Sequence, residues 1–262
     1  MDQPSRHLDA MRAAAPLVQN LTNYVAMNVM ANVMLAAGAS PAMVHAREEA
    51  AEFAGLASAV TVNIGTLDAE WADCMALAAG AAAARGIPWI LDPVAAGATA
   101  LRRETCARLL DLSPTIVRGN ASEILALSGA AARGRGADAV DSVDAAQDAA
   151  RDLARRLGTV VAVTGPVDFV TDGARAARVS NGDPMMPRVT ALGCALTGVV
   201  GAVAATASAF EGTVAALAYY GAAGERARRR AGGPGSFQVA FLDALHALRG
   251  AELDAMARIE AI

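Results

Sequence analysis

Four short runs rich in branched apolar residues recur along the middle of this chain, each separated from the next by a segment of helical length. The intervening segments, residues 68 to 85, 101 to 112 and 143 to 157, carry helical spacing and good helix formers. Repeated alternation of strand and helix predicts a parallel sheet with right-handed crossovers, in an α/β fold. The predicted strands are AVTVNIG (residues 59 to 65), IPWILDP (87 to 93), PTIVRGN (114 to 120) and TVVAVTG (159 to 165).

The flanking segments extend this pattern on both sides. PLVQN, at residues 16 to 20, predicts an earlier strand, which is followed by a helix over residues 22 to 37. Residues 167 to 182 predict a hairpin around an Asp-Gly turn. Such a hairpin would add antiparallel strands at one edge of the parallel sheet.

The composition suits a single domain built in layers. Hydrophobic residues make up 55% of the 262 residues and aromatic residues only 4%, so small side chains would let helices pack closely on the sheet. The Gly-rich segment 128 to 142 is expected to be a surface loop, and the chain from residue 194 onward is expected to be helical. No linker or internal repeat is evident, so residues 1 to 262 are expected to form one domain.

The charged residues exclude several classes of chemistry. All 22 residues counted as lysine plus arginine are arginine, which excludes a Schiff-base lysine, a Walker A lysine and the strand lysine of protein kinases. A net charge of -4 offers no basic surface for nucleic acid, and the run RARRR at residues 226 to 230 indicates a solvated helix face.

Localisation is predicted from the cysteines and the apolar stretches. Three scattered cysteines, and an N-terminus without the order of a signal peptide, predict a cytoplasmic protein. The uncharged stretch from residue 191 to residue 210 is diluted by Gly, Ser, Thr and Ala, so it predicts a buried helix rather than a membrane span.

Polar or turn-forming residues stand at the carboxyl end of each predicted strand. Ligands of an open parallel sheet bind beyond these ends, so the residues there are expected to surround one crevice. Any one such ending would also suit an ordinary turn, whereas four together indicate a site. These residues are Asn63 and Gly65, then Asp92, then Arg118, Gly119 and Asn120, and finally Thr164 and Gly165.

Two acidic residues near these ends are candidate magnesium ligands. Asp92 could be a turn residue, or it could orient a hydrated Mg²⁺ ion. Asn120 and Glu123 form an Asn-x-x-Glu pattern typical of a capping box, and Glu123 could equally share that ion with Asp92. Arg118 ends a strand that is expected to be buried, so an anion is expected beside it, either a phosphate or Glu123.

The segment from Thr190 to Cys194 is expected to be the turn that opens the next helix. Its backbone amides and the helix dipole would attract an anion, and a thiol at Cys194 would have a lowered pKa. Taken alone, a cysteine there could also be an inert, buried small residue. Thr164 and Gly165 could offer a hydroxyl and a close backbone approach, or could form a plain turn.

These parts indicate phosphoryl transfer without a P-loop. Magnesium carboxylates, an arginine and a helix N-terminus would face one crevice at the strand ends, and such chemistry needs mainly positioning and charge neutralisation.

Several long motifs, in the same order along nearly the whole chain, resemble those of the hydroxyethylthiazole kinase family, which belongs to the ribokinase-like superfamily and serves thiamine salvage. The resemblance implies a ribokinase-like three-layer sandwich, with a mostly parallel central sheet, helices on both faces and an antiparallel edge hairpin. It also implies that ATP, with Mg²⁺, phosphorylates the primary alcohol of 4-methyl-5-(2-hydroxyethyl)thiazole. The motifs are PLVQNLTNYVAMNVMANVMLAAGASPAM, ILDPVAAGAT, RGNASEI, VTGPVDFVTDG and VTALGCALTGVVGA.

The resemblance also implies a homotrimer, with each thiazole held at a subunit boundary, and it assigns roles to single residues. Cys194 stands where most of the superfamily has an aspartate base. The other implied residues are Arg118, Thr164 and Gly193 for ATP, Asp92 and Glu123 for Mg²⁺, and Met43, Ala191, Asn23 and Gly65 for the thiazole.

The turn before Cys194 departs from the pattern of the family. Gly-Thr-Gly-Cys is common there, whereas this chain has Ala191, Leu192 and Gly193 before Cys194. Backbone amides can still donate, but Leu192 makes the turn bulkier and stiffer, which bears on the rate rather than on the type of reaction.

Three other functions stay open. One is a kinase for the pyrimidine half of thiamine, against which the segment QNLTNYVAMNVMANVM favours the thiazole. Another is an ATP-dependent hydro-lyase of the same fold that repairs hydrated nicotinamide cofactor. By resemblance, such enzymes need an aspartate at the position of Cys194, and this chain lacks it. The last is a nucleotide-binding regulator without turnover.

Overall fold

A nine-stranded sheet forms the centre of the computed structural model, which describes residues 3–129 and 143–262. The strand order is β2-β1-β3-β4-β5-β6-β7-β8-β9. The strands from β2 to β6 pair in parallel, and those from β6 to β9 pair antiparallel. The strands are β1 (Leu17–Leu21), β2 (Ser40–Ala42), β3 (Ala59–Asn63), β4 (Trp89–Asp92), β5 (Ile116–Asn120), β6 (Val160–Thr164), β7 (Asp168–Thr171), β8 (Ala176–Val179) and β9 (Ile259–Ala261).

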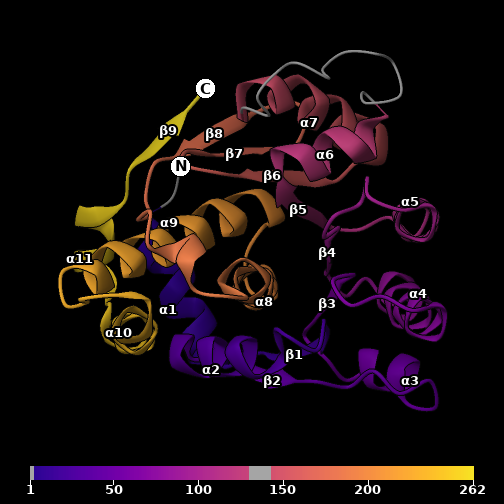
Figure 1. Cartoon of the computed structure of the whole chain (residues 1–262), viewed down its shortest axis with the longest axis horizontal. Helices are drawn as coiled ribbons and strands as arrows, with labels where there is room; N and C mark the ends of the chain where they lie inside the picture. The colour runs from indigo at the N-terminus through magenta and orange to yellow at the C-terminus, as the bar shows by residue number, and fades with distance from the viewer. Residues whose placement is uncertain (1–2, 130–142) are drawn as a thin grey trace.

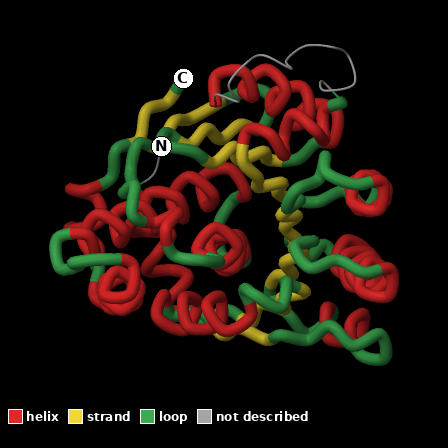
Figure 2. Tube along the Cα trace, in the orientation of Figure 1, coloured by secondary structure: helices red, strands yellow, loops and turns green. Residues whose placement is uncertain are grey.

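Helices cover both faces of this sheet, so the molecule has three layers (Figure 1, Figure 2). Helices α3 to α7 lie on one face, and α1, α2 and α8 to α10 lie on the other (Figure 1). The helices are α1 (Pro4–Ala14), α2 (Met27–Ala37), α3 (Ala50–Ala54), α4 (Ala69–Ala84), α5 (Ala100–Leu110), α6 (Ala121–Ser128), α7 (Val143–Leu157), η2 (Met186–Arg188), α8 (Leu192–Ala204), α9 (Ala209–Arg228), α10 (Pro234–Ala247) and α11 (Gly250–Met256).

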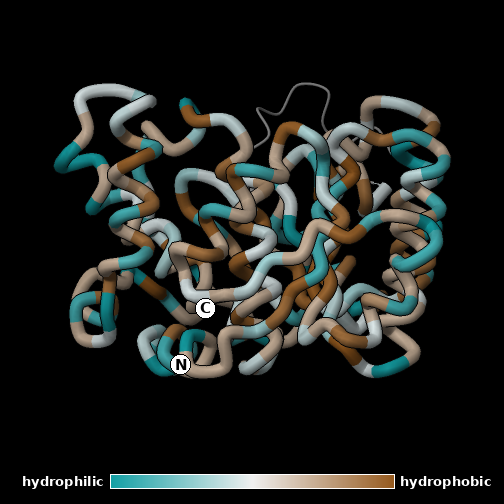
Figure 3. Tube along the Cα trace, turned by 90° about the horizontal axis from the view of Figure 1, so that it is seen from below, coloured by the Kyte–Doolittle hydropathy of each residue, from teal (hydrophilic) through white to brown (hydrophobic). Residues whose placement is uncertain are grey.

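Helix α8 lies at the centre of its layer, where small residues let it approach the sheet. A Cβ on Gly201 would lie 2.8 Å from Thr61 Cγ2 on β3, and one on Gly198 would lie 2.5 Å from Met34 Sδ on α2. The helix is buried along nearly its whole length, and the hydrophobic stretches of the chain concentrate inside the molecule (Figure 3). This packing fixes the first turn of α8 against the carboxyl ends of the strands.

The structure confirms the predicted strand–helix alternation. The four predicted strands are β3 to β6, which are neighbours in the parallel sheet, and the predicted hairpin is β7 and β8. Register places Asn63 opposite Asp92 and Asn120 opposite Thr164, so adjacent strands end at the same level. Their terminal side chains therefore meet at one edge.

Three details of the prediction were wrong. The helix expected from residue 22 begins only at Met27, because a turn closed by the Ala26 N–H on Asn23 O precedes it. Two three-residue edge strands, β2 and β9, were missed, and β9 lies in the region expected to be wholly helical. The stretch 191 to 210 is not one helix, since α8 ends at Ala204 and α9 begins at Ala209.

Two further expectations concern loops and membranes. Of the predicted surface loop at 128 to 142, residues 130 to 142 lie outside the described residues. Among the helices that the structure describes, none has the length and hydropathy needed to cross a membrane.

Candidate active site

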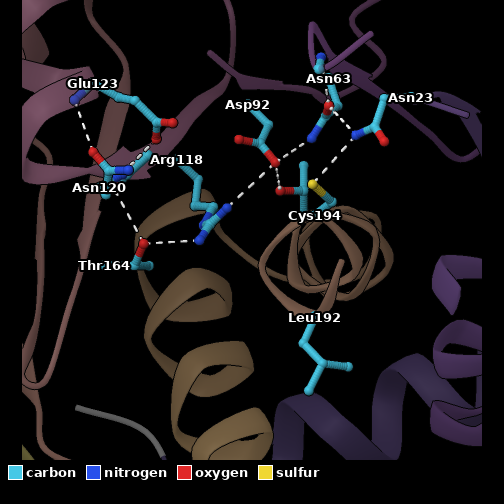
Figure 4. Close-up of polar contacts among 12 residues, drawn as sticks. Asn23, Asn63, Asp92, Arg118, Asn120, Glu123, Thr164, Leu192 and Cys194 are labelled. Carbon is cyan, nitrogen blue, oxygen red and sulfur yellow. Dashed lines mark hydrogen bonds and ion pairs between the residues drawn. The ribbon is translucent and has the colours of Figure 1, made fainter. Parts of the chain in front are cut away.

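The carboxylate of Asp92, at the end of β4, is the centre of a buried hydrogen-bond network (Figure 4). Its Oδ2 accepts from Asn63 Nδ2 at 2.6 Å and from Thr197 Oγ1 at 2.8 Å, and it lies 3.4 Å from Arg118 Nη1. Its Oδ1 is buried and has no hydrogen-bond partner among the described residues. One oxygen is therefore fully engaged, and the other is available to a ligand.

Burial dominates the electrostatics of Asp92. Only 1% of the residue is exposed, and this burial, with the nearby charge of Glu123, raises the pKa of the carboxyl to about 6. Arg118 and the two hydrogen bonds oppose that rise. The group is mostly ionised above neutral pH, where an added cation would be strongly attracted to it.

Arg118, on the neighbouring strand β5, joins Asp92 to the end of β6. Its Nη2 donates to Thr164 Oγ1 at 2.8 Å, and its Nε is buried with no partner among the described residues. Its carboxylate partner is Asp92 rather than the expected Glu123. The unpaired Nε leaves the guanidinium able to bind a further anion.

Asn120 and Glu123 form the capping box that their spacing suggested. The Glu123 N–H donates to Asn120 Oδ1 at 2.9 Å, and Glu123 Oε2 accepts from the Asn120 N–H at 2.8 Å. Glu123 Oε1 also accepts from the Ala95 N–H at 3.0 Å, in the loop that follows Asp92. The cap therefore holds the Glu123 carboxylate at the carboxyl edge of the sheet, beside the loop that follows Asp92.

Cys194 lies in the first turn of α8, half-buried beside the ends of β1 and β3 (Figure 4). Its sulfur accepts a hydrogen bond from Asn23 Nδ2 at 3.4 Å. The expectation of a lowered thiol pKa was wrong: burial and then the Asp92 carboxylate raise the pKa of Cys194, and the hydrogen bonds of Asn23 and Asn63 only partly oppose this. The cysteine is a neutral thiol at physiological pH.

The turn before Cys194 brings the backbone close to Arg118. A Cβ on Gly193 would lie 3.6 Å from Arg118 Nη2, so the glycine backbone and the guanidinium border the same space. Ala191 has φ 62°, in the left-handed region that favours glycine. Leu192 is 3% exposed, and its side chain lies on the other side of α8 from Cys194 (Figure 4).

A cleft of about 870 Å³ opens in front of this turn. Four residues assigned by resemblance line it, namely Arg118, Thr164, Ala191 and Gly193. Most of its lining comes from the turn between β6 and β7, from the segment that leads from Asn181 to the start of α8, and from α9. Such a volume suits a ligand of nucleotide size.

Three of the four thiazole residues implied by resemblance follow the carboxyl ends of the parallel strands β1, β2 and β3. Asn23 follows β1, and Gly65 follows β3. The two residues are in close contact, since a Cβ on Gly65 would lie 2.5 Å from Asn23 Nδ2. Met43 follows the edge strand β2 and packs against the apolar cluster of α2 and α8. Only Ala191 of this set borders the cleft described above.

Three residues at the site were missed in the sequence. Thr197 is one helical turn after Cys194, a spacing that could have placed it toward the sheet. Asp168 lines the cleft and accepts from the Gly165 N–H at 2.9 Å, while burial raises its pKa to about 7. Arg102, at the start of α5, donates to Val94 O at 2.8 Å and to the carbonyls of residues 64 and 65, which no local pattern indicated.

Residues 8–251 of the chain match the model of the hydroxyethylthiazole kinase family. A hydroxyethylthiazole kinase of Cereibacter sphaeroides is 64% identical over 261 residues, covering 100% of both chains. One of Rhizobium etli is 63% identical over 254 residues, covering 96% of this chain and 98% of the relative.

Solved structures that are similar to this chain support both the family and the fold. A hydroxyethylthiazole kinase protein of Pyrococcus horikoshii superposes with a TM-score of 0.93, at 38% identity and with 100% of both chains covered. A ribokinase-like superfamily protein of Enterococcus faecalis superposes with a TM-score of 0.63 at 11% identity, covering 91% of this chain and 93% of that chain, which shows the fold alone. The chain has a ribokinase-like α/β fold and belongs to the hydroxyethylthiazole kinase family.

Proposed function

We propose that this protein transfers the γ-phosphoryl group of ATP to the primary alcohol of 4-methyl-5-(2-hydroxyethyl)thiazole, in thiamine salvage. The observation that carries the proposal is the meeting of Asp92, Arg118 and the Gly193–Cys194 turn at one crevice. A full-length relative of that activity, 64% identical, supports the choice of substrate.

ATP is assigned to the cleft in front of α8. Arg118, Thr164 and Gly193 are its proposed contacts, and all three line that cleft. The Arg118 guanidinium, whose Nη2 lies beside Gly193, and the uncapped backbone amides at the start of α8 are donors suited to phosphate oxygens. Together they neutralise charge on the group that moves.

Mg²⁺ is assigned to Asp92 and Glu123. The fit rests on Asp92 Oδ1, a buried oxygen without a partner, and on Glu123, whose charge acts on Asp92. No cluster of three or more His, Cys, Asp or Glu side chains suited to a metal occurs within residues 3–129 and 143–262, so two carboxylates and water would have to hold the ion. When bound, Mg²⁺ supplies charge neutralisation at the phosphates.

The thiazole is assigned to Asn23, Met43, Gly65 and Ala191. A trimer with these residues at the subunit boundary is part of the proposal. It is supported by the exposure of Tyr24 and Val25, 64% and 57%, directly beside Asn23. Sedimentation of the purified protein tests the trimer.

Cys194 is assigned the position next to the reacting alcohol. Because burial raises the pKa of its thiol, Cys194 mainly shapes the pocket, and only its minor thiolate form would accept the alcohol proton. In a loose transition state the alcohol proton leaves late, so a strong base is not required.

The test is to incubate the protein with ATP and Mg²⁺ and with each of three substrates. Phosphorylated thiazole supports the proposal. Phosphorylation of the pyrimidine alcohol, or ADP release with repair of hydrated nicotinamide cofactor, would replace it with one of the other enzymes. Nucleotide binding without any product would indicate a regulator.

A further inference from the structure

We propose that Asn63 is a positioning residue for the reaction: it holds the Asp92 carboxylate on one side and, through Asn23, the sulfur of Cys194 on the other. This inference rests on the proposed function, because it assigns Asp92 and Cys194 to the reacting crevice. Asn63 is the last residue of β3 and is fully buried, so water cannot replace its partners.

The orientation of the Asn63 amide is fixed from both ends. The Gly65 N–H can only donate, and it lies 3.0 Å from Asn63 Oδ1. The ionised Asp92 carboxylate can only accept, and its Oδ2 lies 2.6 Å from Asn63 Nδ2. A flipped amide would place oxygen against oxygen and N–H against N–H, so only one orientation satisfies both neighbours.

The orientation of the Asn23 side-chain amide is fixed as well. The Ala26 N–H donates to Asn23 Oδ1 at 3.0 Å, so Asn23 Nδ2 must be the donor on the other side of its amide. Nδ2 donates one hydrogen to Asn63 Oδ1 at 2.8 Å and lies 3.4 Å from Cys194 Sγ. The sulfur is therefore the acceptor of this hydrogen bond, which leaves its own S–H uninvolved in it.

The consequence is that a single side chain couples the two halves of the site. Asn63 supplies one of the donors that occupy Asp92 Oδ2, which leaves Oδ1 as the available oxygen. It also keeps Asn23 turned toward Cys194. Loss of the amide would free both Asn23 and Asp92 to rotate, without removing any group that touches the substrates.

The test compares Asn63→Leu with the control Thr61→Val. Thr61 is a fully buried residue two positions earlier on β3, and its hydroxyl donates to Asn20 at 2.7 Å, outside this network. At one fixed pH, the rate of iodoacetamide alkylation of Cys194 is measured by mass spectrometry, together with kcat and the KM for ATP. Cys194 is the only cysteine between Arg188 and Arg226, so one tryptic peptide reports it.

For Asn63→Leu, we expect alkylation of Cys194 to fall about tenfold, because the sulfur loses a hydrogen bond that favours its thiolate. We expect kcat to fall about tenfold as well, because Asp92 and Asn23 are no longer held in place. The KM for ATP should stay within about twofold, and Thr61→Val should match the parent in all three quantities. An equal or faster alkylation rate in a folded Asn63→Leu protein overturns the proposal, as does an equal loss in the control.

If Asn63→Leu does not fold, the proposal is tested instead by NMR of the side-chain amides in the parent protein and in Cys194→Ala. The Asn23 amide signals should move while the Asn63 pair keeps its position and its slow exchange with solvent. Fast exchange at Asn63 would overturn the inference. Failure of the parent protein to phosphorylate the thiazole would instead reject the proposed function, since alkylation does not depend on turnover.

Discussion

Arg118 and Asp92 form an ion pair inside the molecule: Nη1 lies 3.4 Å from Oδ2, and the two side chains are 10% and 1% exposed. An exposed pair, Arg108 and Asp73, is closer at 2.6 Å, but its side chains are 53% and 45% exposed. Because desolvation rather than distance sets what the loss of one partner costs, the two pairs should respond very differently to the same substitution.

We predict that Arg118→Met lowers the free energy of unfolding by about 3 kcal/mol at pH 8, since Asp92 is left charged and unpaired. It should also lower kcat/KM for ATP at least about 100-fold, because the guanidinium that donates hydrogen bonds to the phosphate oxygens is lost. Arg108→Met should cost less than about 1 kcal/mol and leave the kinetics unchanged. Urea unfolding and steady-state assays measure both, and equal costs for the two variants would contradict the argument.

For Cys194 we predict that replacement by aspartate preserves or improves turnover, because a carboxylate accepts the alcohol proton more readily than a protonated thiol does. Cys194→Ala should reduce kcat by less than the ~10²–10⁴-fold that loss of a full general base would cause. Single-turnover kinetics and binding titrations make the comparison. An inactive Cys194→Asp protein that still binds ATP and thiazole would show that the cysteine has another role.

The sequence predicted the place of the site because parallel strands in register end together. Asn63, Asp92 and Thr164 could be found from strand ends alone, and the capping box of Asn120 and Glu123 from local spacing. Such features depend on residues near one another in the chain, so no tertiary information is needed to find them.

Features that depend on packing between distant segments could not be found in this way. The partner of Arg118 is Asp92 rather than Glu123, which is decided by how adjacent strands point their side chains. The pKa of Cys194 is raised because α8 buries the thiol beside Asp92, an effect that outweighs the hydrogen bonds of Asn23 and Asn63. The short strands β2 and β9 carry too few residues to show a pattern.

We predict that Ala191→Gly stabilises the protein by up to about 1 kcal/mol. Ala191 has φ 62°, a conformation that costs alanine about 1–2 kcal/mol, and the greater freedom of glycine in the unfolded chain cancels part of the gain. Ala15→Gly is the matched control, because Ala15 has φ 43° at the end of α1. Both should raise the midpoint of urea unfolding; a loss at residue 191 alone would indicate that the alanine side chain contributes packing there.

The last prediction concerns Asp168, whose carboxyl is buried in the wall of the cleft. Burial raises its pKa to about 7, while the Gly165 N–H and Arg118 oppose the rise. The folded state therefore holds this proton over a pH range in which the unfolded chain has released it. Stability from this group is fully present below about pH 4 and is lost as the pH rises through 7.

Asp168→Asn removes this titration and keeps an oxygen for the Gly165 N–H. The variant should gain stability relative to the parent by about 3 kcal/mol between pH 5 and pH 8, at about 1.36 kcal/mol per pH unit over the two units below the pKa. Urea unfolding of both proteins at the two pH values measures the difference. A gap between parent and variant that is the same at pH 5 and pH 8 would show that the Asp168 carboxyl is ionised across the whole range, and that its hydrogen bond to Gly165 outweighs its burial.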